Sequence, residues 1–136
     1  VNMPDYQSVL TLIGLKQLLG AQVSVAYPLD YVYEDWGGEA SALYGRGFGY
    51  SRVLDTGVKN ENEAAGTELG LSREALAAFD AVVVGSITRN GDVAHKLLSI
   101  YPPEKTVWIH GEDDGPTGAE IAAYRKAGVT AFAREL

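Results

Sequence analysis

Polar side chains that could bind a ligand or move a proton gather in three short segments, at residues 3–8, 85–90 and 110–115. Each segment follows a stretch that we predict to be a β-strand. Ligands of open α/β sheets bind beyond the carboxyl ends of the strands, so we expect the three segments to share one edge and bind a polar ligand there. The residues expected to contact it are Asp5, Gln7, Ser8, Ser86, Arg89, His110, Glu112 and Asp113.

The chemistry of these segments has competing interpretations. Asp5, His110 and Asp113 are each able to take a proton from a hydroxyl group, so they are the candidates for a catalytic base, and none is singled out. Three carboxylates close to His110 would also suit a hard cation or a polar substrate. Successive residues point in different directions, however. We therefore favour a turn in which the backbone holds His110 and an aspartate caps the next helix, and we predict no metal site.

Residues 85–90 could let a phosphate approach the backbone beside Arg89. The sequence contains neither GxGxxG nor GxxxxGK[ST], so neither common nucleotide-binding motif is present. The alternative is a tight turn in which Ser86 or Thr88 caps the following helix. We predict no cofactor.

A fourth candidate, Arg46, stands among glycines in residues 45–49. It could contact an anionic ligand or form an ion pair with the first polar segment. Tyrosine, tryptophan and phenylalanine surround it, and they could stack on a sugar, contact a partner, or simply form a small core of their own.

The elements that must position these residues follow from hydrophobic periodicity. We predict helices at residues 8–19, 92–100 and 117–127, another that opens near Ser72, and strands at residues 1–2, 22–26, 81–85, 106–109 and 129–133. Alternating strands and helices imply a parallel sheet with right-handed crossovers. The prediction is one α/β domain over residues 1–136, a three-layer Rossmann-like or flavodoxin-like fold with a mainly parallel sheet of about five strands. Residues 30–70 form an irregular excursion rich in aromatic residues and glycine, in which residues 60–70 are the most mobile.

Composition narrows the classes of function. The net charge of −7 argues against nucleic-acid binding, which requires basic patches. The apolar runs are too short for a membrane span, and the first residues do not resemble a signal peptide, so a cytoplasmic location is expected. With no cysteine, the chain has neither disulfides nor thiolate metal sites.

Several phrases in a particular order carry a family resemblance. They are residues 3–8 (MPDYQS), 43–48 (LYGRGF), 79–87 with Arg89, and 101–114 (YPPEKTVWIHGEDD). They resemble the N-terminal Rossmann-like domain of bacterial proteins assigned as glycosyltransferases of the two-domain GT-B type. The resemblance implies an acceptor-side domain with a sugar-containing or other small ligand and a second α/β domain after residues 132–136. The second domain would carry most of the nucleotide-sugar site, so this truncated domain alone would not be an active transferase.

A competing hypothesis is a non-catalytic module of flavodoxin-like or receiver-like fold that binds a small ligand or a protein. A receiver would need a lysine on its last strand, where residues 131–134 are AFAR. A homodimer formed through the aromatic residues also stays open.

Overall fold

The computed structural model describes residues 6–133 and divides the chain into two compact units, Val1–Gly70 and Leu71–Leu136. The second unit is α/β with a parallel sheet, as the sequence predicts. The predicted strand at residues 1–2 lies outside the described residues. That residues 1–136 form one domain stays a prediction. No helix within residues 6–133 combines the length and the apolar character that crossing a membrane requires.

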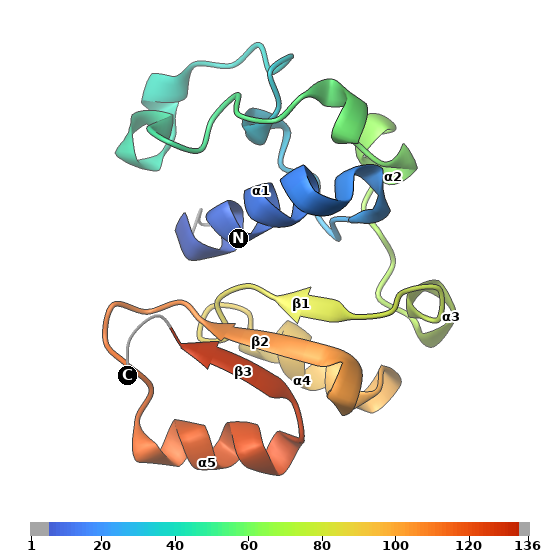
Figure 1. Ribbon diagram of the computed structural model, residues 1–136, viewed down its shortest axis with the longest axis vertical. Helices are drawn as coiled ribbons and strands as arrows, with labels where there is room; N and C mark the ends of the chain where they lie inside the picture. The colour runs from blue at the N-terminus through green and yellow to red at the C-terminus, as the bar shows by residue number, and fades with distance from the viewer. Residues whose placement is uncertain (1–5, 134–136) are drawn as a thin grey trace. The chain divides into compact units, whose positions relative to one another are not determined.

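The second unit is built around a three-stranded sheet in the order β1 (Val82–Val84), β2 (Thr106–His110), β3 (Thr130–Ala133). A short helix, α3 (Arg73–Leu76), precedes it, and α4 (Gly91–Ile100) and α5 (Gly118–Ala127) connect the strands. Both crossovers step in the same direction along the sheet. Two right-handed crossovers in one direction place both helices on one face, which is the arrangement in Figure 1.

The core of this unit centres on Trp108, which is 3 % exposed. Its ring contacts that of His95 on α4, at 6.4 Å between centroids, and that of Tyr124 on α5, at 5.7 Å. Trp108 pairs in register with Val84 of β1, which is also buried. The apolar face of α4 adds Leu97. One central tryptophan therefore fixes both helices against the sheet.

Helix α5 begins at a different cap from the one that we favoured, because the N-cap residue is Thr117 and not an aspartate of the preceding loop. Thr117 and Glu120 form a capping box, in which the Thr117 hydroxyl accepts from the Glu120 amide and the Glu120 carboxylate accepts from the Thr117 amide. Gly128 ends the helix at φ 75°, a left-handed conformation that glycine adopts without a steric penalty.

The sheet is smaller than predicted, because the described residues contain three strands instead of about five. The predicted strand at residues 22–26 is the clearest error. Residues 20–22 form a 3-10 turn (η1, Gly20–Gln22), and residues 23–26 belong to no strand. Backbone carbonyls of this segment accept hydrogen bonds from side chains and not from a neighbouring strand. The carbonyl of Val23 accepts from Lys16 Nζ at 2.6 Å, and that of Val25 accepts from Asn62 Nδ2 at 3.0 Å.

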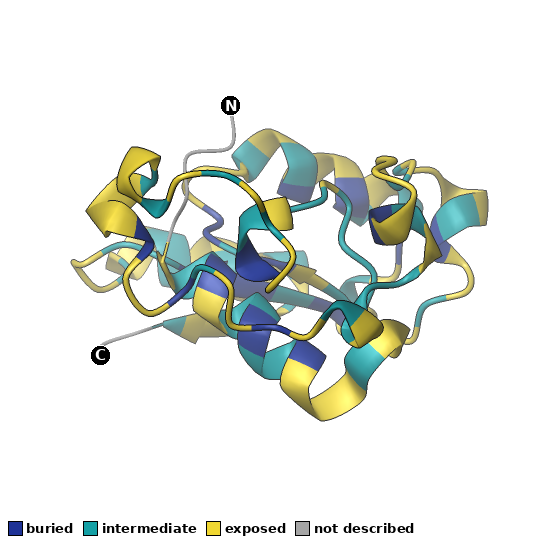
Figure 2. Ribbon diagram, turned by 90° about the horizontal axis from the view of Figure 1, so that it is seen from above, coloured by how far each residue is buried: buried dark blue, intermediate teal, exposed yellow. Residues whose placement is uncertain are grey.

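The first unit consists of one long helix and a chain of short turns. Helix α1 (Tyr6–Leu19) is followed by η1, η2 (Asp30–Val32), η3 (Ala40–Ala42), η4 (Tyr44–Gly47), η5 (Thr56–Val58) and α2 (Glu61–Ala64). Two tyrosines of the excursion, Tyr33 and Tyr50, lie in a small apolar cluster, as one of the interpretations of its aromatic residues predicts, but the excursion shares this cluster with α1. The buried members of this cluster, whose burial Figure 2 maps on the ribbon, are Val9, Ile13, Val32, Tyr33, Tyr50 and Leu54.

A buried lysine joins α1 to these turns. Lys16 is 0 % exposed, and its ammonium donates to the Val23 carbonyl, to the Val58 carbonyl at 2.9 Å and to the Glu63 carboxylate. The three protons of the ammonium thus meet three acceptors from three separate segments. The Tyr33 hydroxyl donates to the other Glu63 oxygen, and burial together with this carboxylate raises the pKa of Tyr33.

Replacing Lys16 by Met should destabilise the first unit strongly, because Glu63 would remain buried without its counter-charge. Removing one partner of a buried ion pair typically costs about 3–5 kcal/mol. Urea unfolding followed by hydrogen exchange at the α1 amides measures this loss. Should this variant fail to fold, Tyr33→Phe removes a single hydrogen bond to the same carboxylate, with an expected loss of about 1.5–3 kcal/mol.

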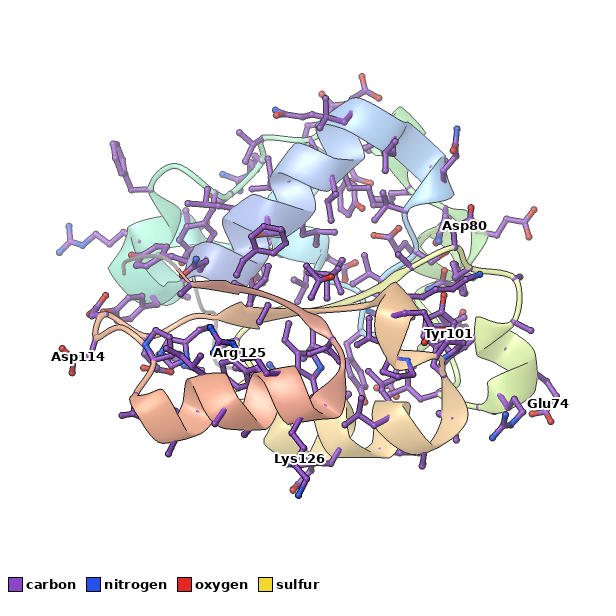
Figure 3. The ribbon with its side chains drawn as sticks, turned by 60° about the horizontal axis from the view of Figure 1, so that its bottom comes forward. Glu74, Asp80, Tyr101, Asp114, Arg125 and Lys126 are labelled. Atoms are coloured by element: carbon purple, nitrogen blue, oxygen red, sulfur yellow. The ribbon has the colours of Figure 1, made fainter. Side chains whose placement is uncertain are left out.

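The matched control is Lys126→Met on α5, whose side chain projects away from the helix (Figure 3) and should be near neutral. Lys16→Met and Tyr33→Phe proteins as stable as the control would contradict this role of the buried network.

Candidate functional site

Two of the three predicted polar segments, residues 85–90 and 110–115, meet beyond the carboxyl ends of β1 and β2. The Ile87 amide donates to the Ile109 carbonyl at 2.8 Å, which ties the turn after β1 to the end of β2. The Thr88 hydroxyl then donates to Glu112 Oε1 at 2.6 Å, and Arg89 Nε lies 3.5 Å from the same oxygen. Both segments are thereby joined through one carboxylate.

Ser86 makes the tight turn that starts the first of these loops. It is fully buried with φ 38°, a conformation uncommon for a residue other than glycine. Its carbonyl accepts from the Arg89 amide at 3.2 Å and from both the amide and the side chain of Asn90 at 3.1 Å. Its hydroxyl lies 3.2 Å from that of Thr88. Ser86 therefore shapes the loop from inside and lies too deep to meet solvent.

The start of α4 differs from one of the two interpretations of this loop. That alternative has Ser86 or Thr88 capping the helix, but the residue at the N-cap position is Asn90, which makes no side-chain cap. Its side chain bonds back to Ser86 instead, and the Thr88 hydroxyl turns to Glu112. The side chains of Asn90 and Thr88 therefore bond within the two loops, and neither caps α4.

His110 holds the second loop in place. It is 4 % exposed, with Nδ1 3.0 Å from the Tyr124 hydroxyl and Nε2 3.1 Å from the Asp114 carbonyl. A carbonyl only accepts, so Nε2 donates to the Asp114 carbonyl, while Nδ1 shares a hydrogen bond with the Tyr124 hydroxyl. Both ring nitrogens therefore have partners. The backbone contact is the one that we favoured from the sequence, whereas the predicted aspartate cap of the next helix is wrong. Burial raises the pKa of Tyr124, which keeps its hydroxyl protonated.

Glu112 is the charged centre of the loop pair. The hydrogen bond from Thr88 lowers the pKa of its carboxyl group, and Arg89 adds to this effect. The carboxylate is therefore ionised at neutral pH, while 39 % of the Glu112 side chain and 43 % of the Arg89 side chain stay exposed. Asp113 and Asp114 are exposed beside them, with Asp114 at the outer edge of the loop in Figure 3.

This arrangement offers a hydrogen-bond acceptor and a donor side by side. Glu112 can accept from a ligand hydroxyl or amine, and Arg89 can donate to a ligand oxygen. Within residues 6–133, no three His, Asp or Glu side chains are grouped so as to hold a metal ion. The Glu112–Arg89 pair is suited to bind a small polar molecule beyond the carboxyl ends of β1 and β2.

The remaining predicted residues belong to the first unit. Asp5 lies outside the described residues. Gln7 and Ser8 stand in the first turn of α1, because the helix begins at Tyr6 and not at Ser8 as we expected. Arg46 is exposed in the turn η4. The ion pair that we considered between Arg46 and residues 3–8 stays a prediction.

Sequence reasoning missed two residues as parts of this site. Thr88 was considered as a helix cap, and its position in the loop gave no sign that it would bind Glu112. Tyr124 was considered only as part of a helix, although it follows the capping residue Thr117 by seven positions, which is two helical turns. That spacing places Tyr124 on the same side of α5 as Thr117, which follows the His110 loop.

The Thr88–Glu112 hydrogen bond can be tested by titration. In Thr88→Val, the pKa of Glu112 should rise toward the usual glutamate value, because the main cause of its lowering is lost. Arg89→Ala should raise it by less. Carboxyl ¹³C chemical shifts measured against pH report both. Since the folded pKa is lowered, the contact stabilises the protein above the ordinary carboxyl pKa, and this stability is lost as the pH falls through the lowered value.

Thr117→Val is the matched control. Its hydroxyl is the main cause of the lowered pKa of Glu120, so that pKa should rise while Glu112 is unchanged. An unchanged Glu112 pKa in Thr88→Val, or a larger effect from Arg89→Ala, would refute the geometry described for the loop pair.

Comparisons of the whole chain with protein-family models, with curated proteins and with solved structures find no match. The resemblance to glycosyltransferase domains therefore rests on the phrases quoted from the sequence. What the site can do must be inferred from its own residues, chiefly the exposed Glu112–Arg89 pair held by Thr88.

Proposed function

We propose that the second unit binds a small, hydroxyl-rich ligand at the carboxyl ends of β1 and β2. The observation that carries this proposal is the Glu112 carboxylate, which bonds to Thr88 and Arg89 from the neighbouring loop and still stays partly exposed. A sugar-like ligand presents hydroxyl groups that donate and accept at once. Glu112 would accept from such a group and Arg89 would donate to the next.

The buried residues would act by keeping this pair in position. Ser86 sets the turn that carries Thr88 and Arg89, while His110 anchors the loop that carries Glu112. A pre-organised pair loses little conformational freedom on binding, which favours affinity for a small ligand. Asp113 is exposed next to Glu112, so a second carboxylate lies beside the pair.

The more specific form of the proposal uses the family resemblance. In that form the chain is the acceptor-side domain of a GT-B-like glycosyltransferase, with a three-layer Rossmann-like fold and a second α/β domain that supplies the nucleotide-sugar site. The parallel sheet of the second unit supports its α/β class alone, because acceptor-side domains of this kind are α/β. This unit would then hold the sugar-containing acceptor in the cytoplasm.

Titration of the ¹⁵N-labelled chain with separate probes tests ligand binding. The probes are a neutral methyl glycoside series, a nucleoside diphosphate sugar and inorganic phosphate. We expect at least one glycoside to shift the amide signals of residues 86–92 and 110–114, because those amides surround the Glu112–Arg89 pair. Inorganic phosphate and the nucleotide sugar should shift them less, since an ionised carboxylate repels anions.

Glu112→Gln and Arg89→Ala should each weaken this response by about tenfold, the change expected when one hydrogen bond to a charged group is lost. Glu104→Gln is the matched control, since Glu104 is exposed in η6 (Pro103–Lys105), which precedes β2 and so lies at the opposite end of that strand. If no glycoside shifts these amides, or if Glu104→Gln weakens binding as much as Glu112→Gln, the proposal is wrong.

A further inference from the structure

The most exposed large apolar side chain of the first unit stands on the turn η4. Phe48 is 90 % exposed, and Tyr44 at the start of the same turn is 65 % exposed. Arg46 lies between these two residues in the sequence, and it is also exposed. Tyrosine and arginine are among the residues that contribute most to binding energy at protein interfaces. We call Glu39, Tyr44, Arg46 and Phe48 the η4 patch.

This turn is held in a defined conformation. The Arg46 amide donates to the Leu43 carbonyl at 2.8 Å, and the Phe48 amide donates to the Gly45 carbonyl at 3.2 Å. The Tyr50 hydroxyl donates to the Tyr44 carbonyl from the core of the unit. The exposed side chains are therefore presented on a fixed backbone, which lowers the entropy that binding would cost.

Two features show how closely the turn is constrained. Arg46 has φ 56° and ψ 27°, a left-handed conformation that is unfavourable for a residue with a side chain. At Gly45, with φ 57°, a Cβ would overlap the hydroxyl of Tyr6, whose ring packs on that of Tyr44 at 5.3 Å between centroids. The rest of the unit thus maintains a strained turn on which the side chains of Tyr44, Arg46 and Phe48 are exposed.

The charges of the patch complement each other. Glu39 directly precedes η3, which packs against η4, and its side chain is exposed like that of Arg46. Within residues 6–133, neither of these two side chains takes part in an ion pair. An interface between two identical copies related by a twofold axis requires such self-complementarity, because each residue of one copy meets a different residue of the other.

We infer that two copies of this chain associate through the η4 patch. Phe48 of each copy packs against Tyr44 of the other, and Arg46 of each pairs with Glu39 of the other. A projecting side chain that is 90 % exposed is suited to fill a hollow in a second surface, whereas small ligands bind in concave sites that surround them. The patch is small, so the dimer is weak and depends on concentration.

Sedimentation equilibrium of the full chain from about 10 µM to about 1 mM tests the inference. We expect a monomer–dimer equilibrium at low salt that Phe48→Ser and Arg46→Glu each shift toward monomer by at least tenfold in the dissociation constant. Leu18→Ser is the matched control and should leave it unchanged. Leu18 is 82 % exposed near the end of α1, about 18 Å along the helix from Tyr6.

A charge swap distinguishes a second copy from any other occupant. Arg46→Glu alone and Glu39→Arg alone should each be monomeric, because like charges would face each other. An equimolar mixture of the two should dimerise, since each remaining contact then joins opposite charges. A wild-type chain that stays monomeric throughout the range, a dimer that survives Phe48→Ser and Arg46→Glu, or a mixture that stays monomeric would overturn the inference. Circular dichroism establishes that each variant is folded.

Discussion

The organisation of the first unit depends on the burial of one ammonium group. Lys16 is the single charge in an otherwise largely apolar helix, and it is neutralised by Glu63 from a segment 47 residues away. Leaving either charge unpaired in the interior would cost several kcal/mol, so the pair restricts which turns can pack on α1. Tyr33 and the carbonyls of Val23 and Val58 complete the shell. A segment with few regular elements thereby acquires a defined path.

A related constraint operates in the second unit, with a carboxylate at the surface in place of an ammonium in the core. Glu112 binds Thr88 and Arg89 from the loop after β1, while the buried residues Ser86 and His110 hold the two loops in place. The buried polar groups have their hydrogen bonds satisfied inside the loops, and the charged pair remains accessible. The same division recurs at η4, where Tyr6 and Tyr50 hold the turn and Arg46 and Phe48 stay exposed.

The sequence predicted the second unit well, because its signals are local. The apolar run that contains β1 and the glycine that ends α5 each act within a few residues, whereas the cap at the start of α5 is Thr117 and not the aspartate that we favoured. Residues 22–26 show the opposite case. They alternate like a strand, yet Lys16 and Asn62 occupy the carbonyls of Val23 and Val25. The pairing of Glu112 with Thr88, like that of Lys16 with Glu63, joins residues far apart in sequence, and periodicity contains no information about such pairs.

The central claim is that the loops after β1 and β2 form one site for a hydroxyl-rich ligand. A crystal structure of the chain with the glycoside that gives the largest amide shifts tests it most directly. The account predicts ligand oxygens within hydrogen-bonding distance of the Glu112 carboxylate and the Arg89 guanidinium, with the Thr88–Glu112 contact retained. A glycoside bound only to the first unit, or bound with Glu112 and Arg89 turned away from it, would contradict the account.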